Sequence, residues 1–237
     1  MATGDAVSNG VYVPIITAVE LAIVDRLTRG LGRMVDEVAT YGGEFDDDEL
    51  DDVVRRFPAA WVTFGGVRRT APVSTSREKW HAEAVFVVMV GARSVRDEQT
   101  SRHGGPAKDE VGTNLLVSAV RLLLNEQDMG LPIDKLRPGA VRTLFNTKVR
   151  NDAMSVYACE FRTAWVEDTL FIGAFPESPE AGQTKPTIAQ VFAQYGGQVD
   201  PPLPDFTSLM LSYYTAPGTD RPADAQDLVR MESNDEG

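Results

Sequence analysis

The sequence of 237 residues is poor in the side chains that form covalent cross-links and metal sites. It has one cysteine, Cys159, so no disulfide can form within the chain and a reducing compartment is expected. It has two histidines, His81 and His103, and neither has a second ligand at a motif spacing. Because zinc sites need three or four ligands, no metal site is expected.

Long apolar runs and an excess of positive charge are also lacking. The longest apolar run, Ala84–Ala92, is far shorter than the roughly 20 residues that span a bilayer. Residues Met1–Asp5 show no basic region followed by an apolar core, so no secretory signal is expected. With 23 basic and 35 acidic residues, the net charge is −12. This charge disfavours binding of nucleic acid or an anionic membrane over the whole surface, although a local basic patch stays open.

Common catalytic motifs are missing as well. The chain has neither the Gly-x-Ser-x-Gly elbow nor the Gly-x-x-x-x-Gly-Lys-Ser/Thr phosphate loop, since Gly104–Lys108 has the wrong spacing and contains a proline. Gly30 and Gly32 lack the third glycine of a dinucleotide fingerprint. Cys159 lies on the apolar face of a predicted strand, where a thiol is normally inert. We therefore expect a protein that is not an enzyme and needs no cofactor.

Charge and proline are distributed unevenly along the chain. The last 62 residues, Pro176–Gly237, contain 8 of the 14 prolines, ten acidic residues and three basic ones. This shift predicts a boundary near Phe175, with a compact domain in residues 1–175 and an extended proline-rich acidic arm in 176–237. The stretch Ala216–Gly237 is expected to be disordered.

Helical periodicity predicts two long helices in the domain. Apolar residues recur at helical spacing over Pro14–Thr40, where Gly30 and Gly32 weaken the helix and favour a bend or break. The second long helix is predicted over Lys108–Gln127. Residues 44–57 begin with acidic side chains and end with basic ones, the charge order that a helix dipole favours, so a further helix is predicted there.

Apolar runs predict about four strands. They are Ala59–Gly65, Trp80–Ala92, Gly139–Thr147 and Ala153–Val166, with Leu170–Phe175 as a candidate further short strand. Trp80–Ala92 is apolar at both alternating sets of positions, so it is expected to be covered on both faces. The polar segment 93–109 is expected to be a long mobile loop.

The order of these elements predicts the fold class. It is an α+β domain in which two long helices pack on one face of an antiparallel sheet of about four strands, with a proline-rich C-terminal arm. The other face of the sheet must then be solvated or buried in an interface.

Two sets of residues are candidates for contacts with other molecules. Basic residues gather in the segments around the strands: Arg68, Arg69, Arg77, Lys79, Arg93, Arg96, Arg102, Lys108, Arg137, Arg142, Lys148 and Arg150. They are either solvated charge or a contact surface for an acidic partner, of which a second copy of this chain is one example. Candidate docking anchors in the arm are Ile188, Val191, Phe192, Tyr195, Phe206, Leu209, Leu211, Tyr213 and Tyr214. These anchors pack either on their own domain or on a partner.

Four segments resemble a known family. They are Phe57–Gly66 (FPAAWVTFGG), Gly130–Gly139 (GLPIDKLRPG), Val141–Asn146 (VRTLFN) and Val156–Trp165 (VYACEFRTAW). Together they resemble the Mu-like phage and prophage tail proteins that include the tail terminator. The resemblance covers about residues 11–170 and leaves the arm without an assigned role.

The resemblance implies a structural virion protein. Tail terminators are small α+β subunits that form a ring, usually a hexamer, on the head-proximal end of the tail tube, in a virion assembled in the host cytoplasm. The ring stops growth of the tube and joins the tail to the neck or head–tail connector. In a contractile tail, the sheath protein is a further neighbour. DNA only passes through the lumen, and neither a membrane nor a cofactor is implied.

Two alternatives stay open. The chain could be another head–tail connector or neck protein, or it could be a soluble enzyme or small-ligand-binding domain. On the tail-terminator interpretation, sheet edges or faces from 80–92 and 139–166 are expected to form subunit contacts. Residues 66–79 and 93–109 are then expected to reach tube or neck proteins.

Overall fold

A computed structural model describes residues 12–42, 56–94, 98–104, 111–149, 152–179, 187–201, 208–214 and 224–230. The chain divides into two compact units, Met1–Ile172 and Gly173–Gly237, here called the N-terminal and C-terminal units. The predicted acidic helix at 44–57 falls almost entirely outside the described residues.

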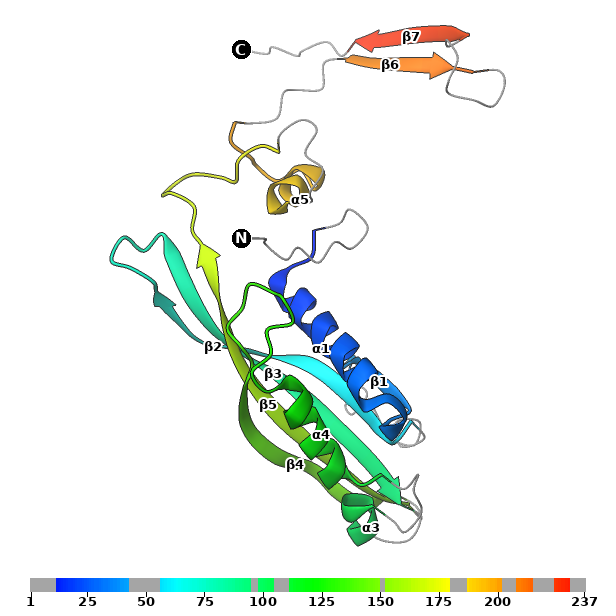
Figure 1. Ribbon diagram of the computed structural model, residues 1–237. Coiled ribbons are helices and arrows are strands. Elements are labelled where there is room, and N and C mark those ends of the chain that lie inside the picture. Colours follow the sequence, from blue (N-terminus) through cyan, green and yellow to red (C-terminus); the bar gives the residue numbers. More distant parts are fainter. Residues whose placement is uncertain are drawn as a thin grey trace. The chain divides into compact units, whose positions relative to one another are not determined.

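The N-terminal unit is built on a five-stranded sheet (Figure 1). Its strands are β1 (Glu37–Thr40), β2 (Ala59–Pro72), β3 (Lys79–Ser94), β4 (Arg137–Val149) and β5 (Asp152–Asp168). Their spatial order is β1-β2-β3-β5-β4; β1 pairs parallel with β2, and the other three pairs are antiparallel. The prediction of an α+β fold is confirmed. The sheet is mostly antiparallel, with five strands and one parallel pair, where an antiparallel sheet of about four strands was predicted.

Two helices cover one face of this sheet, α1 (Ile15–Leu31) and α4 (Thr113–Leu124) (Figure 1). The main hydrophobic core lies between them and the strands. It contains Val19, Ile23 and Leu27 of α1, Leu116, Val120 and Leu124 of α4, Phe86, Val88 and Val90 of β3, and Cys159 and Phe161 of β5. All eleven are fully buried, and burial of this kind stabilises the fold by about 1.5–3 kcal/mol for each large aliphatic or aromatic side chain.

The first helix ends much earlier than the sequence predicts. Gly32 adopts a positive φ of 51° and its N–H bonds to the carbonyl of Thr28, which closes α1. A short 3-10 turn, η1 (Gly32–Met34), follows, and then Glu37–Thr40 form β1. The prediction of helix up to Thr40 is therefore wrong beyond Leu31, because the glycine that weakens the helix ends it and the chain turns back into the sheet.

The second helix is also shorter than predicted, because the backbone is extended at Gly112 (ψ 156°) before it and at Asn125 (ψ 133°) after it. Gly112 precedes α4, and a Cβ at this position would lie 2.3 Å from the backbone nitrogen of Gly104. Gly112 therefore allows the start of α4 to pack against the end of a short helix, α3 (Glu98–His103). The prediction of a loop over 93–109 is wrong for α3 and for the end of β3.

Two strand boundaries differ from the predictions as well. The strand expected to end at Gly65 continues to Pro72, because Gly66 at φ 96° accommodates a bulge in the β2–β3 pairing instead of ending the strand. Leu170–Phe175 do not form a strand, since a turn at Ile172–Gly173 with φ 81° at the glycine interrupts the extended chain.

The opposite face of the sheet carries a second, smaller hydrophobic cluster. It contains Phe57, Ala59, Trp61, Met89, Met154, Val156 and Ala158. Because Val88 and Val90 face the main core while Met89 faces this cluster, β3 is buried on both sides here. The prediction that this strand is covered on both faces is confirmed for its second half.

The C-terminal unit contains a helix and a hairpin. Helix α5 (Ile188–Gln194) begins with a capping box between Thr187 and Gln190. Strands β6 (Ser208–Tyr213) and β7 (Ala225–Arg230) pair antiparallel. The sequence predicts disorder over Ala216–Gly237, whereas part of this stretch is β7, whose pairing with the apolar β6 supplies the order.

Candidate functional site

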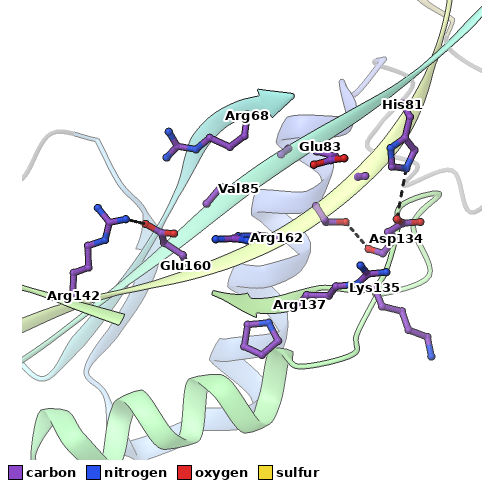
Figure 2. A pocket seen from close by; sticks show the side chains of 14 residues that line it. Arg68, His81, Glu83, Val85, Asp134, Lys135, Arg137, Arg142, Glu160 and Arg162 are labelled. Carbon is purple, nitrogen blue, oxygen red and sulfur yellow. Dashed lines mark hydrogen bonds and ion pairs between the residues drawn. The ribbon is translucent and has the colours of Figure 1, made fainter. Parts of the chain in front are cut away.

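The open face of the sheet has a charged part beside the small apolar cluster. This part forms a hollow of about 810 Å³ that we call the arginine hollow (Figure 2). Its lining residues are Arg68, His81, Glu83, Ala84, Val85, Asp134, Lys135, Arg137, Pro138, Arg142, Glu160, Arg162, Thr163 and Ala164. Five of these are basic and three are acidic, so the hollow is locally positive on a chain whose net charge is −12.

Strand alternation places these side chains on the open face. On β5, Phe161 and Trp165 belong to the main core, so Glu160 and Arg162 point the other way. On β3, Ala84 and Phe86 face the core, so Glu83 and Val85 face the hollow. Val85 is 3% exposed and lies directly across from Arg162, which gives the hollow an apolar floor beneath its charges.

One ion pair neutralises part of the charge, and a histidine contacts a second carboxylate, as Figure 2 shows. Arg142 Nη2 lies 3.1 Å from Glu160 Oε1, and the side chain of Glu160 is only 12% exposed. His81 Nε2 lies 3.7 Å from Asp134 Oδ2, and the backbone of Asp134 accepts a hydrogen bond of 2.5 Å from Thr163 Oγ1. A third basic lining residue, Lys135, is directed at Glu126 with a separation of 4.0 Å.

Three arginines of the hollow, Arg68, Arg137 and Arg162, form no ion pair with any carboxylate in the part of the chain that the structure describes. Arg137 and Arg162 are directly opposite each other in the β4–β5 pairing. Like charges at such a cross-strand position destabilise a sheet. The arrangement therefore favours an anion, and planar guanidinium groups suit carboxylates or phosphates.

Two titratable groups with raised pKa values lie away from this hollow, the buried Cys159 and the half-buried Glu20. Burial raises the pKa of the Cys159 thiol to about 11, and the positive charge of Arg121 opposes the rise. The thiol is therefore protonated at neutral pH and unreactive. Burial also raises the pKa of the Glu20 carboxyl on α1, and a hydrogen bond with the backbone of Phe64 lowers it in part.

The hollow brings together only some of the basic residues that the sequence singled out. Arg68, Arg137 and Arg142 line it, whereas Lys79 pairs with Asp168 at 3.3 Å at the end of the β3–β5 ladder. Arg69, Arg77, Arg93 and Arg102 do not line the hollow. Arg96, Lys108 and Arg150 lie outside the described residues, as does the side chain of Lys148.

Sequence reasoning missed Arg162 and Lys135 as members of the site. The alternation of β5 places Glu160 and Arg162 on its polar face, but the position of Arg162 opposite Arg137 depends on the β4–β5 register. Two irregularities in that pairing, between Pro138 and Val141 and between Thr143 and Phe145, set the register, and no local sequence pattern predicts them.

The candidate docking anchors of the C-terminal unit lie on two elements. Ile188, Val191 and Phe192 belong to α5 and are followed by Tyr195, while Leu209, Leu211 and Tyr213 belong to β6 and are followed by Tyr214. Phe206 lies outside the described residues. Leu209, Leu211 and Tyr213 share one face of the hairpin with Val229 of β7, and all four are 36–50% exposed. Whether they dock on the domain or on a partner stays a prediction.

Neither metal ligands nor a membrane-spanning helix are found in the described ranges. No group of three or more histidine, cysteine, aspartate or glutamate side chains among them is arranged to hold a metal ion. None of the described helices combines the length and apolar character needed to cross a membrane.

Comparison with known proteins identifies the family of the N-terminal unit. The family model described as Bacteriophage Mu, Gp37 matches residues 15–166, from the start of α1 to near the end of β5. No curated protein matches the chain. The matched region contains all five strands of the sheet, α1, α4 and every residue that lines the arginine hollow. The chain therefore belongs to the bacteriophage Mu Gp37 family and is a Mu-like phage protein of a structural or morphogenetic kind.

Proposed function

We propose that this protein is a tail terminator: a structural virion protein that forms a ring, of six subunits in the simplest case, on the head-proximal end of a phage tail tube. The ring stops tube growth and joins the tail to the neck, with the sheath protein as a further neighbour in a contractile tail. The observation that carries the proposal is the family match over residues 15–166, together with the resemblance of the strand segments to Mu-like tail proteins.

The surface of the N-terminal unit suits an assembling subunit. One face of its sheet is covered by α1 and α4, while the other carries the arginine hollow. Charged surfaces of this kind supply specificity and register between protein partners. On this proposal the protein is not an enzyme, and its partners are further copies of itself, the tube, the sheath and the neck.

The edge of the sheet is less suited to direct strand pairing between subunits. Of the segments expected to form subunit contacts, β4 lies at an edge, whereas β3 and β5 are interior strands. Strand β4 contains Pro138, and its pairing with β5 is irregular at two points. Proline and bulges protect edge strands against pairing with other chains. We therefore propose that faces and loops, rather than a continuous intersubunit sheet, form the ring.

The test measures the mass of the assembled protein and its ability to cap the ends of tail tubes. Purified full-length protein is examined by light scattering and negative-stain microscopy, first alone and then with purified tail tubes of the parent phage. Rings alone, or rings that appear at tube ends and halt tube growth, are the expected result. Protein that leaves tube ends bare but binds the portal side of isolated heads would instead be a neck or connector protein, and the tail-terminator assignment would fail.

A further inference from the structure

The arginine hollow holds more positive charge than its own neighbours neutralise. Arg142 and His81 face the carboxylates of Glu160 and Asp134, but Arg68, Arg137 and Arg162 have no such partner among the described residues. Arg137 and Arg162 moreover repel each other across the β4–β5 ladder. A ligand with carboxylates or phosphates would relieve this repulsion, so the hollow is built to receive an anion.

The most acidic part of the same chain is its C-terminal unit. Residues 173–237 contain ten acidic and three basic side chains, a net charge of −7, which leaves −5 for the larger N-terminal unit. Among the described residues of this unit, Asp200 and Asp227 are exposed. The hollow keeps three carboxylates of its own, which disfavours a dense polyphosphate such as nucleic acid more than a peptide with spaced acidic residues.

The segment that connects the two units points to a neighbouring copy as the source of the acidic residues. Leu170, Phe171 and Ile172 are 57%, 81% and 107% exposed. One face of the β6–β7 hairpin also exposes a row of apolar side chains. A two-stranded hairpin needs a packing partner for stability, and a run of exposed apolar residues marks an interaction site. An adjacent subunit of a ring would bury both the connecting segment and the apolar face of the hairpin.

We propose that the arginine hollow of one subunit binds carboxylates of the C-terminal unit of an adjacent copy, so that each subunit clasps its neighbour around the ring. Arg68, Arg137 and Arg162 are the positioning residues on the receiving subunit. This inference rests on the proposed ring function and adds the surface, the partner segment and the chemistry of the contact.

Zero-length carbodiimide cross-linking of the full chain tests the contact directly. Lys135 lines the hollow and its amine can be joined to a carboxylate that touches it. Equal amounts of ¹⁴N- and ¹⁵N-labelled protein are mixed before assembly, alone and on tail tubes, and peptides are identified by mass spectrometry. The pair Lys135–Glu126, separated by 4.0 Å, lies within one subunit and serves as the internal standard with a single isotope.

The expected result is a set of links from Lys135 to acidic residues of the C-terminal unit, with mixed-isotope links as abundant as single-isotope ones. Links with a single isotope only would mean that the C-terminal unit docks on its own domain, which overturns the proposal. No links to the C-terminal unit, with the Lys135–Glu126 standard present, would overturn it as well.

Charge reversal identifies the residues responsible. The double variant Arg68→Glu/Arg162→Glu is expected to reduce the mixed-isotope links roughly tenfold, since it replaces attraction by repulsion. The matched control Arg29→Glu/Arg33→Glu makes the same change of net charge on exposed residues of α1 and η1, away from the hollow, and should leave the links unchanged. If charge reversal disturbs folding, Arg68→Gln/Arg162→Gln supplies a milder test with the same readout.

Two further outcomes separate this inference from its alternatives. If rings cap tubes normally but no mixed-isotope link forms, the inference fails while the tail-terminator function stands. If the hollow instead binds a labelled DNA fragment, and Arg68→Gln/Arg162→Gln abolishes that binding without affecting any link, its ligand is phosphate and the proposed contact is wrong.

Discussion

Cys159 shows how one buried side chain in a strand sets a pH limit on stability. Its thiol is fully buried in the main core and has a pKa of about 11, above the ordinary value of 9.0. The folded state therefore holds this proton more tightly than the unfolded state does. The stabilisation is complete below pH 9 and is lost as the pH rises towards 11, by about 2–3 kcal/mol.

The measurement is the free energy of unfolding by urea at several alkaline pH values. The free energy of unfolding of the wild-type protein should fall by this amount between pH 9 and pH 11. The fall in Cys159→Ala should be about 2–3 kcal/mol smaller, because the variant lacks the titrating thiol. The difference between the two plots of unfolding free energy against pH removes the contribution of the groups that both proteins share. Equal slopes would show that the thiol does not ionise on unfolding in this range.

Two glycines at close contacts predict opposite tolerance to a methyl group. A Cβ at Gly91 would lie 2.2 Å from the ring of Phe57, which is 2% exposed and packed against Trp61 at 5.7 Å between ring centroids. Gly91→Ala should destabilise the protein by about 1–3 kcal/mol, because a fully buried ring has no room to move. The measurement is the urea midpoint and its slope.

Gly30→Ala is the matched control for this substitution. A Cβ at Gly30 would lie 2.6 Å from the methyl groups of Leu123, which is the flexible end of a half-buried side chain. Alanine also favours the helix over glycine by up to about 1 kcal/mol, which offsets the cost of moving Leu123. A loss at Gly30 as large as at Gly91 would contradict the packing argument.

At the scale of an element, the β4–β5 pair contains one favourable and one unfavourable charge contact. Arg137 faces Arg162 directly, whereas Arg142 pairs with the nearly buried Glu160. Arg137→Gln should therefore stabilise the free subunit by about 0.2–1 kcal/mol at low salt, with less effect in high salt, where charges are screened. Arg142→Gln should destabilise it by about 1 kcal/mol, since Glu160 loses its partner.

Thermal unfolding of both variants in low and high salt measures these differences. The opposite signs distinguish a specific cross-strand effect from a general consequence of lowering positive charge on an acidic protein. If Arg137→Gln and Arg142→Gln shift the melting temperature in the same direction, the repulsion across the β4–β5 ladder is not the dominant interaction of Arg137.

The elements show which structural features a sequence pattern can supply. Apolar periodicity located α1, α4 and the strands β2, β3, β4 and β5, because buried faces impose a regular spacing on one segment. It did not locate the parallel strand β1, because Gly32 both weakens and ends a helix, and only tertiary pairing with β2 makes the next residues a strand. It also predicted a strand end at Gly65, whereas β2 continues through a bulge at Gly66, because glycine is typical both of strand ends and of bulges.

The candidate site was predictable only in part for the same reason. The basic residues of β2 and β4 stood out as clusters, but their convergence with Arg162 requires the order β2-β3-β5-β4 and the register of each pair. The sign of the charge on one face of a sheet is a property of four strands together. No local window of the sequence contains it.

At the scale of the whole molecule, charge and apolar surface are divided in a way that suits an assembly more than a monomer. The C-terminal unit carries −7 of the net charge of −12, and the hollow on the N-terminal unit collects positive charge. A run of exposed apolar residues connects the two units along the chain. In the proposed ring, each subunit supplies carboxylates to the hollow of its neighbour and buries the neighbour's apolar run. Formation of the ring and burial of this run should therefore depend on each other.

The connecting segment gives a prediction for the assembly as a whole. Phe171→Ser should leave the free energy of unfolding of the free subunit within about 0.5 kcal/mol, because its side chain is 81% exposed, yet it should shift ring formation to higher protein concentration. Leu122→Ser on α4 is the matched control, with 82% exposure of the original side chain. Light scattering over a concentration series measures both variants. If both substitutions weaken ring formation equally, any loss of apolar surface has this effect. If Phe171→Ser leaves the protein concentration at half-assembly unchanged, the connecting segment lies outside the subunit contact.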